Sequence, residues 1–411
     1  MIESEAKSLD IVGIEMPGAL TFPRGFKASG VRAGLKQSGS DMALILSAVP
    51  AAVAGLFTTN VVKAAPVLLS KKRTAKGCGR AVIVNSGNAN ACTGEQGMRD
   101  AEATGAEVAR FLGLSEEDVF IASTGIIGQQ MPMDLVRTGV EKAIRALGPN
   151  GADAAKAIMT TDTFPKEMAV ESLKIGGTEI RIGGIAKGAG MICPNVATML
   201  SFITTDAAIT PQMLQLCLRR SGEISYNCLT IDGDTSTNDT VIMLANGMAG
   251  NRLISEDGPE LQLFQEALDV VTTGLAKQIA SDGEGATKMI EISVAGANSY
   301  AECRQIAKTI ANSPLVKTAM FGCDPNWGRI LAAAGRSGID FDPAQVELSL
   351  GEILLVKNGE PVQFSDEKAH EYLKERKISV DLKVGPTEHR SRVWTCDFSY
   401  DYVKINAEYH T

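Results

Sequence analysis

The chain of 411 residues has few of the side chains that most often carry metals or act as a general base. Its only histidines are His370, His389 and His410, all near the C-terminal end and none at metal-ligand spacing from a cysteine. The eight cysteines form no CxxC pair. We therefore expect no metal site. A Ser-His-Asp triad is disfavoured but stays open, because triads are recognised by geometry rather than by order in the sequence.

The sequence also lacks the marks of nucleic-acid, membrane and nucleotide binding. Its net charge is −8, and no stretch is rich in Lys and Arg, which argues against a nucleic-acid partner. No basic segment precedes an apolar one at the start, and no apolar run reaches about 18 residues. KGAG (187–190) and GEGATK (283–288) complete no phosphate-binding motif. With scattered thiols that favour a reducing compartment, we expect a cytoplasmic protein with no cofactor.

Helical and strand-like patterns mix along the chain without a regular βαβ rhythm. Apolar residues three and four apart predict helices, and short apolar runs between turn formers predict strands. Expected strands cover 42–48, 80–86, 168–174, 179–185, 288–296, 345–350 and 378–384. Expected helices cover 101–114, 133–148, 211–221, 259–281, 301–313 and 366–376. This mixture predicts a layered α/β sandwich for residues 1–285 and a smaller mixed α/β lobe for 286–411.

The stretch KGAGMICPNVATML (187–200) combines a lysine, a small-residue approach and a Pro-Asn turn before an apolar run. Without a histidine base, a hydroxyl nucleophile can use the free amine of an N-terminal threonine, whose pKa of about 7.7–8.0 suits neutral pH. Cleavage between Ala197 and Thr198 would create that amine. Ala197 offers little steric hindrance, and the β-branched Thr198 is restricted at χ1. Taken alone, the stretch is better explained as a buried strand with threonine at its edge.

Other polar stretches carry possible partners of such a nucleophile. In ASTGIIG (122–128), Thr124 and Gly125 have the hydroxyl and backbone N–H that an oxyanion hole needs. TTDTFPK (160–166) and DGDTSTNDT (232–240) are dense in Thr and Asp, and CDPNWGR (323–329) is a turn. Each alone is also consistent with an ordinary turn. The C-terminal YVKINAEYHT is apolar enough that we expect it to be tied to the protein rather than frayed.

Together these motifs resemble the ornithine acetyltransferase (glutamate N-acetyltransferase) family of arginine biosynthesis. The resemblance runs from about residue 10 to Thr411 and rests on STGIIG, TTDTFPK, KGAGM-x-x-PN-x-ATML, DGDTSTNDT, DGEGATK, CDPNWGR and YVKINAEYHT. The common family form has Ala where this chain has Cys193, a conservative change in size. Jointly the motifs favour the nucleophile over the plain strand at 198.

The resemblance implies a fold and a set of site residues. Members resemble N-terminal-nucleophile hydrolases, with an αββα sandwich, and cut themselves before the Thr of ATML. Here the cut would fall between Ala197 and Thr198, leaving associated chains of 197 and 214 residues in an α2β2 heterotetramer. Thr198 would be the nucleophile, with Thr124 and Gly125 as the oxyanion hole. The implied substrate contacts are Thr161, Lys187, Thr198, Glu284, Asn406 and Thr411.

The implied reaction is a ping-pong acetyl transfer. N-acetylornithine acetylates Thr198 and leaves as ornithine, and glutamate then takes the acetyl group as N-acetylglutamate. Lys187 would hold the α-carboxylate of either substrate, and Glu284 the side-chain ammonium of ornithine. Acetyl-CoA is left open as a second acetyl donor. Two alternatives remain: an aminopeptidase or amidase, in which water resolves the acyl-enzyme, and a non-catalytic α/β binding protein that never cuts itself.

Overall fold

The structure, a computed structural model, describes residues 11–193 and 199–408. The elements before the proposed cut are β1 (Gly13–Ile14), β2 (Phe26–Val31), β3 (Met42–Phe57), α1 (Ala65–Thr74), β4 (Cys78–Asn88), α2 (Gly94–Leu112), β5 (Val119–Ile126), α3 (Met133–Arg145), α4 (Gly151–Ala157), β6 (Lys166–Val170), β7 (Leu173–Ile175), β8 (Thr178–Ile180) and β9 (Ile182–Lys187).

The elements after the proposed cut begin with two strands and two long helices and end with the smaller lobe. They are β10 (Leu200–Thr205), α5 (Pro211–Ile224), β11 (Thr240–Ala245), α6 (Pro259–Ser281), β12 (Met289–Ala295), α7 (Tyr300–Ala311), α8 (Pro314–Phe321), α9 (Trp327–Gly335), β13 (Glu347–Leu350), β14 (Ile353–Lys357), β15 (Glu360–Pro361), α10 (Asp366–Tyr372), β16 (Lys377–Lys383), β17 (Arg390–Cys396) and α11 (Tyr400–Glu408).

One nine-stranded sheet forms both inner layers of the larger part of the molecule. Its order is β1-β6-β9-β10-β11-β3-β4-β5, with β2 also paired to β3. The long strand β3 joins the two layers: Met42–Leu46 pair with β4, whereas Ala52–Phe57 pair with β11. The register of β3 against β4 shifts between Leu46 and Ala51, and such an irregularity bends a strand.

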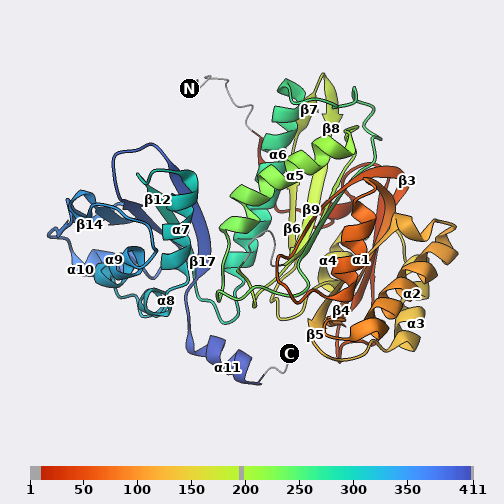
Figure 1. Ribbon diagram of the computed structural model, residues 1–411, viewed down its shortest axis with the longest axis horizontal. Coiled ribbons are helices and arrows are strands. Elements are labelled where there is room, and N and C mark those ends of the chain that lie inside the picture. Colours follow the sequence, from red (N-terminus) through yellow and green to blue (C-terminus); the bar gives the residue numbers. More distant parts are fainter. Residues whose placement is uncertain (1–10, 194–198, 409–411) are drawn as a thin grey trace.

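Helices cover the outer face of each layer, which completes an αββα sandwich (Figure 1). Helices α5 and α6 lie on one side, and α1, α2 and α3 on the other. The strands alternate between the two cores: Phe202 of β10 packs between the sheets with Val82 and Phe120, whereas Ile203 packs outward with Leu214 of α5. The predicted layered α/β sandwich is therefore confirmed.

The C-terminal part has its own sheet and core. Six strands in the order β15-β14-β13-β16-β12-β17 pack against α7, α8 and α9, with Ile292, Ile306 and Val380 in the core. In Figure 1 this lobe lies on the left, beside α6. The predicted boundary at 285/286 falls between α6 and β12. The division into two domains there remains our proposal.

Several predicted boundaries follow from capping chemistry. Helix α6 starts at Pro259, which suits a first turn because that turn needs no backbone N–H. The Ser299 Oγ caps α7 by accepting the Glu302 N–H at 3.2 Å. The Glu302 carboxylate reaches back to the Asn298 N–H at 3.0 Å, one residue before the cap itself. Each of these signals involves residues that are neighbours in the chain, so it could be recognised in the sequence.

Other predicted elements differ from the structure. Helix α2 begins at Gly94 rather than 101, and α10 ends at Tyr372 rather than 376. The single strand expected at 168–174 is instead β6 and the start of the β7–β8 hairpin, because that segment leaves the main sheet. The C-terminal segment that we expected to be tied to the protein forms α11, none of whose residues is buried. Ring stacking of Tyr402 on Phe398 and polar contacts hold it instead.

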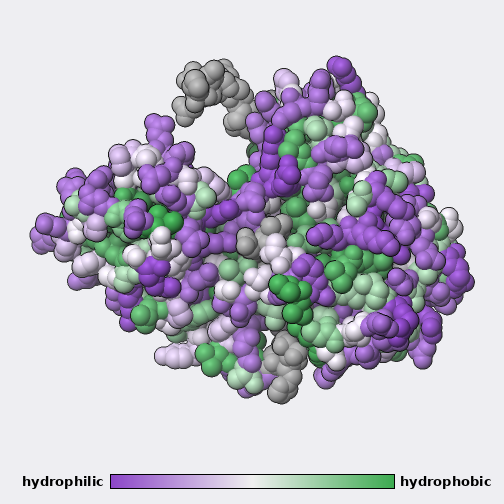
Figure 2. Space-filling model, viewed as in Figure 1, coloured by the Kyte–Doolittle hydropathy of each residue, from purple (hydrophilic) through white to green (hydrophobic). Residues whose placement is uncertain are grey.

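Hydrophilic side chains cover most of the face seen in Figure 2, and hydrophobic ones gather in small patches. Among residues 11–193 and 199–408, no helix has the length and apolar character needed to cross a bilayer. All eight cysteines fall within these ranges, and all are free thiols.

Candidate active site

The candidate site is a cavity where the loops between β9, β10 and β11 meet the end of β5. Lys187 ends β9 and is paired with Leu200, the first residue of β10. Leu200 is paired in turn with Thr240 at the start of β11. The Asn238 amide, just before β11, donates to the Ser123 carbonyl oxygen of β5 at 2.8 Å. Strand pairing and this hydrogen bond therefore bring four separate segments to one point.

Six of the nine predicted site residues line this cavity. They are Thr124, Gly125, Thr161, Lys187, Glu284 and Asn406. The other three, Ala197, Thr198 and Thr411, lie outside the described residues. Met199 and Leu200, which directly follow Thr198 in the sequence, line the cavity as well.

Lys187 is the central cation of the cavity, and only 8% of its surface is exposed. Its Nζ donates to Thr160 Oγ1 at 2.6 Å and to Thr124 Oγ1 at 3.5 Å, and it lies 4.0 Å from Asp162 Oδ2. Burial lowers the pKa of Lys187, and the negative charge of Asp162 opposes this shift. A buried ammonium with nearby hydroxyls is suited to bind a carboxylate.

Thr124 and Gly125 both line the cavity. Since the Thr124 oxygen accepts from Lys187, its own hydrogen remains available to a developing oxyanion. Gly125 has φ +131°, and a Cβ there would lie 2.3 Å from the Gly87 carbonyl carbon. Any other residue would be excluded at that position.

Glu284 and Asn406 also line the cavity. Asn406 Nδ2, on α11, donates to Glu284 Oε2 at 2.8 Å, so the C-terminal helix returns to the site. The Glu284 N–H donates to the Ala189 carbonyl oxygen at 2.8 Å. Gly190 packs against this carboxylate, since a Cβ there would lie 2.5 Å from its Cδ.

Four residues near the cavity were not singled out from the sequence. Thr160 and Asp162 contact Lys187, Lys166 lies beneath Asp162, and Asp239 lines the cavity wall. The first three belong to TTDTFPK and Asp239 to DGDTSTNDT, so the motifs were visible. Their individual roles depend on contacts with residues distant in the chain.

Asp239 stands apart because its charge is poorly compensated. It is 2% exposed, and its Oδ2 has no hydrogen-bond partner within the described part of the chain. Burial raises the pKa of its carboxyl well above the usual range, against smaller opposing effects of Ser236, Lys187 and Thr58. Within residues 11–193 and 199–408, no three His, Cys, Asp or Glu side chains are arranged to hold a metal ion.

Comparison with known proteins identifies relatives over nearly the full length of the chain. The ArgJ family model matches residues 27–411. The arginine biosynthesis bifunctional protein ArgJ of Symbiobacterium thermophilum is 51% identical over 402 residues, which cover 96% of this chain and 99% of the relative. ArgJ 1 of Nostoc sp. is 49% identical over 409 residues, covering 97% and 99%. A crystal structure of ArgJ from Bacillus halodurans matches with a TM-score of 0.51 and 45% identity, over 52% of this chain and 100% of that chain.

Proposed function

The chain belongs to the ArgJ family, and on that premise we propose that it moves the acetyl group of N-acetylornithine to glutamate in arginine biosynthesis. The observation that carries the proposal is the cavity, which gathers the buried cation of Lys187, the Thr124 hydroxyl, Gly125 and the carboxylate of Glu284 beside Met199 and Leu200. Relatives that are about 50% identical in sequence are named arginine biosynthesis bifunctional proteins. The name fits a second acetyl donor, acetyl-CoA, which the proposal includes.

The proposed mechanism starts with cleavage between Ala197 and Thr198, which frees the Thr198 amine as a base. The Thr198 hydroxyl then attacks the acetyl carbonyl of N-acetylornithine. Its proton passes through the amine to the departing nitrogen of ornithine, and the oxyanion is held by Thr124 and the Gly125 N–H. Glutamate's amine attacks the acetyl-threonine in reverse order, which restores the hydroxyl.

The two substrates share an α-carboxylate, and we assign it to Lys187 in both half-reactions. The side-chain ammonium of ornithine pairs with Glu284. Thr161, Asn406 and Thr411 complete the substrate contacts. Asn406 supports the assignment of Glu284 because its amide orients that carboxylate.

The length of the matching chain from Bacillus halodurans supports the proposed cut. The Bacillus halodurans chain matches over all of its own length and spans 52% of this chain. Residues 198–411 make up the same share of the 411 residues. We further propose that the two fragments form an α2β2 heterotetramer in the cytoplasm, where the free thiols would stay reduced.

Denaturing electrophoresis with N-terminal sequencing tests the cut. We expect two bands in place of the 43.4 kDa chain, one of them beginning TMLSF, and a single uncut band for Thr198→Ala. If the native chain never converts to two bands, the role of Thr198 as an N-terminal nucleophile is refuted.

Product analysis tests the reaction. With N-acetylornithine and glutamate both supplied, N-acetylglutamate should accumulate along with ornithine. Release of acetate instead would identify a hydrolase of the amidase type, and no product at all would leave a binding protein.

A further inference from the structure

A fully buried lysine lies between two carboxylates that are close in sequence to cavity-lining residues. Lys166 Nζ donates to Asp162 Oδ1 at 2.7 Å and to Asp282 Oδ2 at 2.6 Å, and the exposed fractions of the three side chains are 0%, 0% and 3%. The Phe164 carbonyl oxygen accepts a third hydrogen bond at 3.4 Å. The ammonium therefore uses all three of its donors within the protein, and Lys166 does not line the cavity.

Asp162 connects this lysine to Lys187. Asp162 accepts the Gly188 N–H at 2.6 Å and the Thr160 N–H at 2.9 Å, and its Oδ2 lies 4.0 Å from Lys187 Nζ. Burial alone would raise the pKa of the Asp162 carboxyl, but Lys166 and Lys187 outweigh burial and hold that pKa well below its usual range. Asp162 is thus an anion fixed between two cations, and it anchors the backbone directly after Lys187.

Asp282 connects the same lysine to Glu284. It accepts the Thr163 N–H at 2.9 Å and also the Thr163 hydroxyl. Only Gly283 separates Asp282 from Glu284, whose N–H donates to Ala189 at 2.8 Å. The position of the Glu284 backbone is therefore set from one side by Asp282 and from the other by the loop after Lys187.

We propose that Lys166 is a positioning residue of the acetyl-transfer site, which sets the separation of Lys187 and Glu284 by holding Asp162 and Asp282 together. The inference rests on the proposed function, in which those two residues bind the two ends of ornithine. Burying three charges contributes little net stability, because desolvation offsets the attraction. Misplacing a substrate contact by about 1 Å can cost on the order of 100-fold in rate. The network therefore serves geometry more than stability.

Steady-state kinetics on two variants test the inference. Lys166→Met keeps most of the length of the side chain but removes the cation, and it should raise KM at least about tenfold for both N-acetylornithine and glutamate. Asp282→Asn disturbs only the arm that leads to Glu284. It should raise KM for N-acetylornithine several-fold and leave KM for glutamate within about twofold, a split that general loss of stability would not produce.

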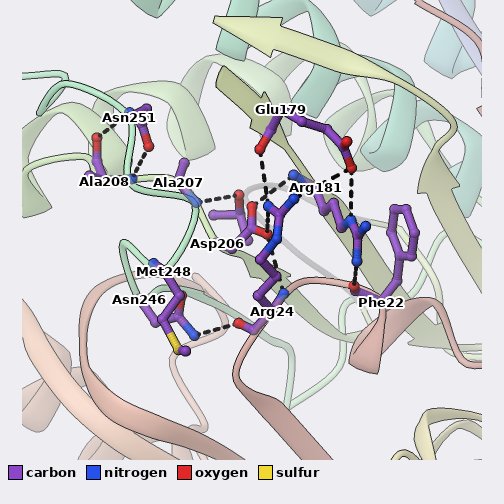
Figure 3. Close-up of polar contacts among 11 residues, drawn as sticks. Phe22, Arg24, Glu179, Arg181, Asp206, Ala207, Ala208, Asn246, Met248 and Asn251 are labelled. Atoms are coloured by element: carbon purple, nitrogen blue, oxygen red, sulfur yellow. Dashed lines mark hydrogen bonds and ion pairs between the residues drawn. The ribbon is translucent and has the colours of Figure 1, made fainter. Parts of the chain in front are cut away.

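Asp206→Asn is the matched control. Asp206 is a buried carboxylate that accepts from Arg24 Nη1 at 2.8 Å, the Arg24 N–H at 3.2 Å and the Arg181 N–H at 2.8 Å (Figure 3). It follows Thr205 at the far end of β10, about 20 Å along the strand from Leu200. This variant should lower the melting temperature and leave both KM values unchanged.

Two results would overturn the inference: unchanged KM values in folded Lys166→Met, or an equal rise of KM in Asp206→Asn. Should Lys166→Met not fold, equal effects of Asp282→Asn on the two substrates would be decisive. Calorimetric binding of ornithine and of N-acetylglutamate separates this inference from the proposed function. If the native protein binds both ligands but transfers no acetyl group, the proposed reaction is refuted and the positioning role of Lys166 is not. That role would then be tested by comparing the Kd values of the same variants for the two ligands.

Discussion

At the scale of single residues, several charged side chains in and beside the cavity are buried, and a buried charge is unfavourable unless it is compensated. Lys187, Asp162, Lys166 and Glu284 are compensated by hydrogen bonds or opposite charge. Asp239 is the exception, with one carboxylate oxygen unpartnered among the described residues. Residues kept in an unfavourable state next to a reaction centre commonly lower stability for the sake of activity.

Asp239→Asn should therefore stabilise the protein at neutral pH. Burial raises the pKa of this carboxyl in the folded state, so its contribution to stability is complete below the ordinary Asp pKa of about 3.9 and is lost as the pH rises through the folded pKa. Asparagine does not ionise and escapes this loss. Thermal unfolding of uncut Thr198→Ala chains should show a higher melting temperature for the variant at about pH 7.5 and little difference near about pH 4.

A difference in melting temperature that does not change with pH would assign the effect to packing instead. Because Asp239 lines the cavity, its substitution can also change activity. Acetyl transfer is therefore measured separately, in a chain that carries Asp239→Asn and keeps Thr198.

Gly190→Ala should weaken donor binding without unfolding the protein. The added Cβ would lie 2.5 Å from the Glu284 carboxyl carbon, so the carboxylate must move. We expect KM for N-acetylornithine to rise about tenfold, since the ammonium contact is lost. The control is Gly335→Ala at the end of α9, where no atom lies within 4 Å of the new Cβ. An unchanged KM in Gly190→Ala would argue against Glu284 as the ammonium partner.

At the scale of elements, the proposed cut would leave two chains that share one sheet. Strands β10 and β11 of the second fragment lie between β9 and β3 of the first. Six residue pairs join β10 to β9, and six more join β11 to β3. Asp206 adds ionic and backbone hydrogen bonds to Arg24 and Arg181 across the same boundary (Figure 3).

The fragments should therefore remain together after cleavage. Size-exclusion chromatography in native buffer should give one peak containing both, at the same position as uncut Thr198→Ala, and separation should need a denaturant. Fragments that elute separately without denaturant would contradict the sheet order.

At the scale of the whole molecule, the chain leaves the αββα sandwich for the C-terminal lobe and returns to the cavity before it ends. Thr230 N–H donates to the Trp394 carbonyl oxygen at 2.9 Å, and the segment after β17 then carries α11 back to the cavity. Of the described residues of α11, none is buried. The helix therefore contributes to the site through Asn406 more than to the core.

Removal of residues 400–411 should thus abolish most transfer while leaving the fold intact. We expect a melting temperature within a few degrees of the full chain and a large rise in KM, because Glu284 loses the Asn406 amide and the remaining terminal contacts are removed. Asn406→Ala should show a smaller effect in the same direction. A truncated chain with native KM would exclude the C-terminal segment from the site, whereas an unfolded one would show that α11 has a structural role.

Local signals in the sequence were enough to place Pro259 and Ser299 at helix starts and to predict a layered α/β sandwich, because each depends on neighbouring residues, whereas the αββα order was implied by the family resemblance. The motifs also pointed to Thr124, Lys187, Glu284 and Asn406, which line one cavity. The tertiary structure decided what joins them: the bend of β3, the return of α11 and the pairing of Lys166 with Asp162 and Asp282. Asp282 is more than 100 residues from Lys166. No local pattern encodes that contact, because it exists only after the sheet and α6 have packed together.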